Sequence, residues 1–333
     1  MTTRATNRWT SLLSQLGPLF ALLLVFTFFA IADKQQPNGG QFTSLRNLQA
    51  MLISSAPVMT ASLGMTIIII SGGIDLSVGT AVALCATVMA WVLKQEGSIE
   101  VALVLCLLTG CVAGCVNGFL VSVLNVAPFI VTLGTMTAYL GIAKLVANET
   151  TVRPPLDSVP VWMNGLAMPS PDPAWLLVAP GVWIMLALAV IVSLVLRYTV
   201  FGRYVFALGS NEQTARLCGL NVPLLKICVY TLAGLFVGLA GIYQFSKLKV
   251  GNPISGVGLE LKVIAAVVIG GASLNGGRGT IMGTLTGALL MQTIVSGCTQ
   301  LGLTNPVQDI ILGIIIVAAV TVDQFRQRRV MGR

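Results

Sequence analysis

Long apolar runs alternate with short polar segments along almost the whole chain. Each run is close to the length of about 20 residues that a helix needs to cross the hydrocarbon core of a bilayer. We therefore predict an all-α polytopic membrane protein with about ten transmembrane helices, formed by a single transmembrane domain over residues 1–333. The predicted spans are 16–31, 48–70, 76–93, 101–123, 127–147, 174–196, 227–245, 257–271, 280–296 and 307–322.

The composition supports a membrane location. Of the 333 residues, 56% are hydrophobic and only 9% are charged, too few charges to cover a soluble core. The net charge is +8, but the basic residues are scattered between apolar runs, so we do not expect nucleic acid as a partner. Their excess in the internal loops places both termini in the cytoplasm. The first run is longer than a signal-peptide core, so we expect a retained span rather than a cleaved signal.

Two segments of the chain, residues 67–79 and 263–279, break an apolar run with a pair of glycines and a polar turn. The candidate pathway residues in these segments are Ser71, Gly72, Gly73, Asp75, Ser77, Gly270, Gly271 and Asn275. Matching interruptions in two halves of a transporter point to the substrate path, because broken helices expose backbone groups. We predict an internal duplication, roughly 45–147 and 224–322, with glycine-broken or re-entrant segments and with these residues on the substrate pathway. The run 257–271 is short for a span and is a candidate half-helix.

Asp75 allows two interpretations. A carboxylate within a bilayer is costly and usually faces a cavity or a partner, which favours a role on the path. The span count places Asp75 near the cytoplasmic edge, where it could instead cap the next helix. Asn117, Asn125 and Thr132 are uncharged polar residues in apolar runs and suit a hydroxyl-rich solute, the alternative being hydrogen bonds between helices.

Several kinds of chemistry are missing from the sequence. No lysine is followed by serine or threonine, so the chain has no phosphate-binding Walker loop. A proton-coupled carrier would place several acidic or histidine side chains in its spans, and this chain has no histidine. Cys106, Cys111 and Cys115 are interpreted as packing residues rather than a metal site. We expect no catalytic and no metal site, and an energy source that is either a partner subunit or a downhill gradient.

The internal loop 197–226 is the candidate docking segment for such a partner. Residues 212–220 are predicted to form a short helix that ends near Gly219 and Asn221, with Pro223 preventing its continuation. A cytoplasmic partner that drives transport needs a docking helix of this kind through which to act on the membrane domain.

Three of these segments carry a family resemblance, over roughly residues 48–322. The segments 71–79, 208–220 and 268–279 resemble motifs of the permease subunits of bacterial ABC sugar importers of the ribose type, a family that includes permeases for xylose, arabinose and autoinducer-2. Residues 208–220 are similar to the cytoplasmic loop that forms the coupling helix in ABC importers. The departures are small, with Thr214 and Cys218 where alanine is more usual.

The resemblance implies a multi-subunit importer in the bacterial inner membrane. Its parts are two permease chains, alike or different, cytoplasmic ATP-binding subunits and a periplasmic sugar-binding protein. ATP and magnesium are bound by the ATPase, and this chain itself binds no cofactor and is not an enzyme. The implied coupling residues are Asn211, Glu212, Ala215, Arg216 and Gly219. For Arg216 a purely topogenic role as an inside charge is the alternative.

Two other function classes compete with this reading. A passive solute channel or a sensor membrane module would have the same spans but no ATPase partner. A membrane-embedded enzyme is disfavoured, because the chain shows no clustered acids, metal set or nucleophile with a base.

Overall fold

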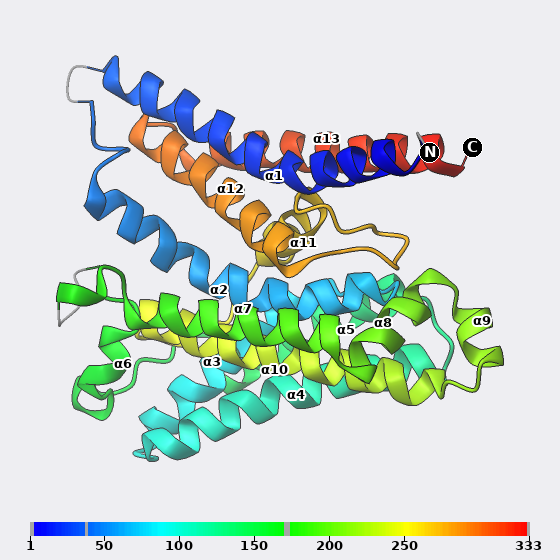
Figure 1. Ribbon diagram of the computed structural model, residues 1–333. Coiled ribbons are helices and arrows are strands. Elements are labelled where there is room, and N and C mark those ends of the chain that lie inside the picture. Colours follow the sequence, from blue (N-terminus) through cyan, green and yellow to red (C-terminus); the bar gives the residue numbers. More distant parts are fainter. Residues whose placement is uncertain (1–2, 37–38, 170–173, 332–333) are drawn as a thin grey trace.

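A computed structural model of the chain describes residues 3–36, 39–169 and 174–331. The described chain folds into a bundle of helices, and each predicted span overlaps one of the helices named next (Figure 1). These helices are α1 (Thr3–Lys34), α2 (Leu45–Ile70), α3 (Val78–Lys94), α4 (Ile99–Val123), α5 (Pro128–Val146), α7 (Pro180–Tyr198), α10 (Val222–Leu248), α11 (Leu259–Ile269), α12 (Ile281–Gln300) and α13 (Asn305–Met331). The prediction of an all-α polytopic membrane protein is confirmed.

The helices differ in whether they are long enough to cross a bilayer. In the described ranges seven are long and apolar enough, namely α1, α2, α4, α5, α7, α10 and α12. Helix α3 has 17 residues, and α11 has 11. At 1.5 Å per residue α11 is about 16 Å long, roughly half the hydrocarbon thickness. It is the half-helix expected within residues 257–271.

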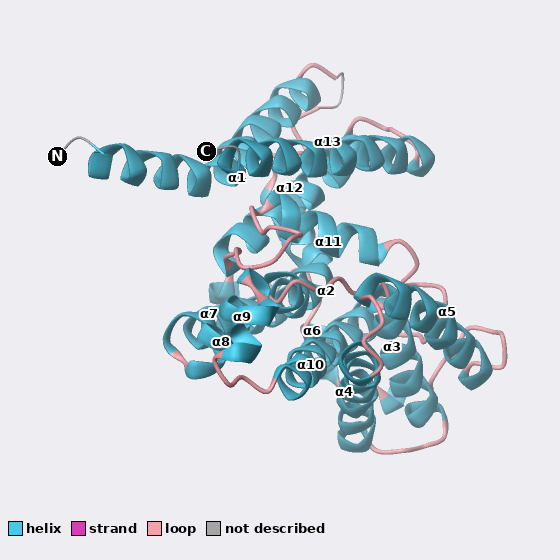
Figure 2. Cartoon of the chain, turned by 90° about the vertical axis from the view of Figure 1, so that its right-hand side faces the viewer, coloured by secondary structure: helices cyan, strands magenta, loops and turns pink. Residues whose placement is uncertain are grey.

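Helix α2 is the centre of the bundle. It packs against α10 and α7 on one side and against α11 and α12 on the other (Figure 2). In its apolar stretch 89% of the residues are buried, against 17% in α1 and in α5. The outer helices instead expose large apolar side chains such as Leu108 and Ile130, as a lipid-facing surface requires. The first glycine break follows α2 and the second precedes α12, which are the two most buried of the seven long apolar helices.

Helices α4 and α10 pack through glycines. A Cβ at Gly110 would come within 2.6 Å of the backbone nitrogen of Gly238, and Gly114 and Gly234 face each other in the same way. Small residues at a spacing of four let two membrane helices approach closely, because no side chain separates their backbones. This contact holds α10 against the part of α4 that carries Asn117.

The segment predicted as the internal loop 197–226 is almost entirely helical. It contains α8 (Val200–Ser210), which the sequence analysis missed, then α9 (Glu212–Leu217) and the start of α10. The short helix ends at Leu217, before the predicted residue 220. Pro223 lies in the first turn of α10. The N–H group that proline lacks would have no partner within the helix at this position, so proline is tolerated there. Helix α1 begins and α13 ends at the same end of the molecule as α9 (Figure 1).

Three further short elements cover the opposite end. Helix α6 (Val161–Gly165) and the 3-10 turns η1 (Leu156–Ser158) and η2 (Ala174–Leu176) lie in the segment between α5 and α7. Val152 of this segment forms an isolated antiparallel bridge with Gly251, which follows α10.

Candidate functional site

The first glycine break is a capped helix end. Ser71 is the C-cap of α2, and Gly72 follows with φ of +86°, a left-handed conformation that disfavours other residues. The amide of Gly73 donates to the Ile68 carbonyl at 2.9 Å, and the amide of Gly72 donates to the Ile69 carbonyl at 3.0 Å. These two bonds define a Schellman motif, which satisfies the last carbonyls of the helix.

The second break repeats this geometry at the end of α11. Gly270 is the C-cap, Gly271 has φ of +92°, and the amide of Ala272 donates to the Val267 carbonyl at 3.1 Å. The same pair of carbonyls is satisfied in the same pattern. The internal duplication itself stays a prediction, but both breaks are built alike.

The two breaks meet in space. The amide of Gly277, in the turn after α11, donates a 2.8 Å hydrogen bond to the carbonyl of Ile70, the last residue of α2. Both breaks therefore lie at the same end of the bundle, the end at which α9 is found.

Beyond the first break the chain turns back into the bundle and places Asp75 in a buried polar cluster. Its carboxylate accepts hydrogen bonds from the Ser77 amide (2.7 Å), the Ser77 hydroxyl (2.6 Å) and the Asn117 side-chain amide (3.3 Å). Asn117 also donates to the Ser77 hydroxyl at 2.8 Å. Asp75 is only 6% exposed, and within the described chain it forms no ion pair. In the described structure its carboxyl group is bound by hydrogen-bond donors.

The geometry refines both interpretations of Asp75. The N-cap of α3 is Ser77 rather than Asp75, whose carboxylate instead binds the amide of that cap residue. Asn117 lies one to two turns before the end of α4, so Asp75 sits about 9 Å inside that end rather than at its edge. Asp75 thus stabilises the start of a helix that begins inside the bundle.

Of the other predicted polar pathway residues, one borders the Asp75 cluster and the others lie away from it. Thr132, in the first turns of α5, donates to the Ile74 carbonyl at 3.3 Å and so borders the cluster. Ser71 donates back to the Ile68 carbonyl of its own helix. Asn125 is exposed, with φ of +51°, in the turn after α4, and the structure does not bring it to the cluster. Asn275 is exposed in the turn of the second break, where its amide donates to the Ser273 hydroxyl.

Two tyrosines complete the cluster and were missed by the sequence analysis. The Tyr139 hydroxyl donates to the Ala113 carbonyl at 2.8 Å and lies 3.2 Å from the Asn117 side-chain oxygen. The Tyr230 hydroxyl is buried, without a hydrogen-bond partner in the described structure, against Gly73. Tyrosines inside apolar runs were the available signal, since a buried hydroxyl normally seeks a partner.

The predicted coupling residues lie together in and around α9. Asn211 is the N-cap and accepts the Thr214 amide at 2.9 Å, and Gly219, with φ of +84°, ends the helix in another Schellman motif. Glu212 pairs with Arg216 at 3.3 Å and with Lys226 of α10 at 2.8 Å. Ala215 is buried, whereas Leu217 is 88% exposed. The helix is fixed to the bundle and presents an apolar side chain outward.

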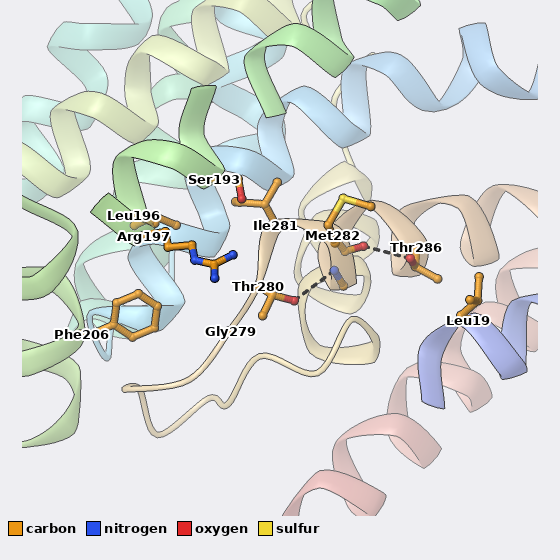
Figure 3. A pocket seen from close by; sticks show the side chains of 11 residues that line it. Leu19, Ser193, Leu196, Arg197, Phe206, Gly279, Thr280, Ile281, Met282 and Thr286 are labelled. Carbon is orange, nitrogen blue, oxygen red and sulfur yellow. Dashed lines mark hydrogen bonds between the residues drawn. The ribbon is translucent and has the colours of Figure 1, made fainter. Parts of the chain in front are cut away.

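A cavity of about 600 Å³ lies between the end of α7, α8 and the start of α12 (Figure 3). Leu196, Phe206 and Met282 give it apolar walls, and the Arg197 side chain reaches toward Thr280 across it. Gly279 and Thr280 belong to the chain that links the second break to α12, so the cavity borders that break.

Comparison with known proteins agrees with this architecture. Residues 47–320 match the family described as branched-chain amino acid transport system / permease component. The ribose import permease protein RbsC of Escherichia coli K12 is 36% identical over 92% of this chain and 94% of its own length. The probable ABC transporter permease protein YphD of the same organism is 37% identical, covering 92% and 89%. The autoinducer 2 import system permease protein LsrC of Photorhabdus luminescens is 31% identical, covering 93% and 89%.

No solved structure matches the chain significantly. The family match covers most of the chain, and the relatives span nearly its full length. The chain is therefore a multi-pass membrane protein that belongs to the permease-component family of ABC importers, on the branch that resembles the ribose and autoinducer-2 permeases.

Proposed function

We propose that this chain is the membrane-spanning permease subunit of an ATP-driven importer that carries a monosaccharide, a ribose-like pentose or a hexose, across the inner membrane. A separate subunit hydrolyses ATP, and ATP and magnesium are bound there rather than by this chain. The names of the relatives, which are ribose and autoinducer-2 import permeases, support the substrate class.

The observation that carries the proposal is the position of α9. This short helix is capped at both ends, is tied to α10 through Glu212 and Lys226, and exposes Leu217 almost completely. It lies at the end of the bundle where the two glycine breaks meet. An ordered helix with an outward apolar side chain suits docking to a partner protein, and the breaks suit a path that opens and closes.

The proposal extends to the orientation of the chain and to its other partners. With α9 facing the cytoplasm, the chain termini also lie in the cytoplasm, and the segment that contains α6 faces the periplasm. A sugar-binding protein delivers the solute to that outer face. The exposed apolar side chains of α4, α5 and α7 contact lipid or a second permease chain, which is a copy of this one or a close relative.

Purification from native membranes tests the proposal. The tagged chain, extracted in a mild detergent, is expected to copurify with a protein that carries Walker motifs, identified by mass spectrometry. Leu217→Asp is expected to reduce that recovery, whereas Leu108→Ala on the lipid-facing side of α4 leaves it unchanged. A chain that copurifies with no ATP-binding protein would support a passive channel or a sensor module instead.

A further inference from the structure

Helix α8 ends where the two glycine breaks meet. Gly209, in its last turn, packs directly on the end of α2, because a Cβ at this position would overlap the Ile70 carbonyl oxygen. The same Cβ would lie 2.7 Å from the backbone nitrogen of Gly277, in the turn after α11. Gly209 therefore touches both partners of the hydrogen bond that joins the breaks.

The turn of the second break approaches α8 with equal closeness. A Cβ on Gly276 would lie 2.6 Å from the Gly209 carbonyl oxygen and 3.0 Å from the Gly72 Cα. A Cβ on Gly277 would lie 2.7 Å from the Ser210 hydroxyl. Three chain segments thus meet backbone to backbone. We call this contact the glycine junction, and it comprises Ile70, Gly72, Gly209, Ser210, Gly276 and Gly277.

Close approach is the reason for glycine at position 209. The residue lies within α8 and has helical neighbours, so its backbone does not need the left-handed conformation. Alanine is a better helix former than glycine, and α8 alone would favour it. The contact with Ile70 and Gly277 is what excludes a side chain.

The surroundings of the junction differ on its two sides. Asn211, directly after α8, is the N-cap of α9, so the docking helix continues the chain from the junction with no intervening loop. On the other side, the chain at Gly279 and Thr280 borders the 600 Å³ cavity (Figure 3). The turn of the second break is thus in close contact with α8, and the chain that follows the turn borders the cavity.

We propose that the glycine junction transmits movement of the docking helix α9 to both glycine breaks at once. This inference rests on the proposed function, since it assumes that an ATPase moves α9. Backbone contacts without side chains cannot absorb a displacement by a change of rotamer, so a shift of α8 displaces Ile70 and Gly277 together. The cavity beside Gly279 and Thr280 provides the space into which the turn can move.

Hydrogen exchange tests this inference without a transported solute. The complex with its ATPase, in nanodiscs, is compared in the resting state and after trapping with ATP and vanadate. The Gly277 amide, bonded to Ile70, is expected to change its exchange rate roughly tenfold, the size of an ordinary coupling free energy. Peptides that cover α9 should respond to the same trapping.

A variant pair isolates the junction. In Gly209→Ala the response at residues 273–280 should be lost while α9 still responds, and Gly134→Ala, where a Cβ meets nothing within 4 Å, should behave as the wild type. If α9 responds in the wild type but the Gly277 amide does not, the inference is overturned and the proposed function stands. If α9 itself does not respond, the proposed function fails, and the inference with it. Should Gly209→Ala not assemble, the wild-type comparison alone decides.

Discussion

The backbone amide of Gly277 and the carbonyl of Ile70 lie 2.8 Å apart, in a hydrogen bond that joins the second glycine break to the helix before the first. The two residues come from opposite halves of the chain. A bond between these halves makes the two breaks a single structural unit.

Gly219→Arg is expected to uncouple transport while leaving membrane insertion intact. Gly219 has φ of +84°, where a side chain costs about 1 kcal/mol, so the end of α9 should distort. Space is not the obstacle, because a Cβ there meets nothing within 4 Å. ATP hydrolysis and uptake by the reconstituted complex measure the effect. Gln213→Arg adds the same charge to α9 without the strained backbone and should retain coupling, and normal uptake by Gly219→Arg would refute the role of α9.

Asp75→Asn should destabilise the protein by about 1–3 kcal/mol, because its new amide group would face the Asn117 donor and leave a buried polar group unpaired. Thermal unfolding in detergent measures the change. The exchanged pair Asp75→Asn with Asn117→Asp restores a donor opposite an acceptor and should recover most of the loss. Additive losses in the double variant would contradict the hydrogen-bond network. Uptake that is unchanged in Asp75→Asn would favour the helix-stabilising role over a role on the path.

Tyr139→Phe should lower the stability by about 1 kcal/mol, since it removes the hydroxyl that bonds to Ala113 and Asn117. The apolar ring stays in place, so no cavity forms. Tyr204→Phe, on the exposed part of α8, is the matched control and should leave the melting temperature unchanged. Equal effects of both substitutions would place Tyr139 outside the network.

Gly114→Ala should weaken the contact of α4 with α10 and cost about 1–3 kcal/mol, because its Cβ would overlap the Tyr230 carbonyl oxygen. The yield of monodisperse protein and its melting temperature report the loss. Gly141→Ala in α5 has open space around the added carbon and serves as the control. A fully stable Gly114→Ala would show that the two helices are farther apart than described.

The sequence located the helices well because lipid demands apolar segments of a defined length. The half-helix α11 was also visible, since its run is short and ends in two glycines. Helix α8 was not, because residues 200–210 are too short and too mixed in polarity to resemble a span. The short helix α9 is three residues shorter than the predicted 212–220, because Gly219 follows the C-cap Cys218 and does not belong to the helix.

The site was predicted in part. Asp75, Ser77 and Asn117 were each identified and do lie together, but their hydrogen bonds and their depth depend on how α3 starts inside the bundle. Asn125 lies outside the cluster, because an asparagine in a left-handed turn and one beside a polar cluster look the same in a sequence. The meeting of Ile70, Gly209 and Gly277 could not be predicted, because glycine contacts carry no side-chain pattern and join distant segments.

Under the proposed function, this chain moves a sugar only when a partner subunit hydrolyses ATP. The most direct test is uptake of radiolabelled ribose, with xylose and arabinose as alternatives, by proteoliposomes that contain the chain, its copurified ATPase and the sugar-binding protein. We predict uptake with ATP and none with a non-hydrolysable ATP analogue. Equal uptake in both conditions, or uptake by the chain alone, would contradict the proposed function.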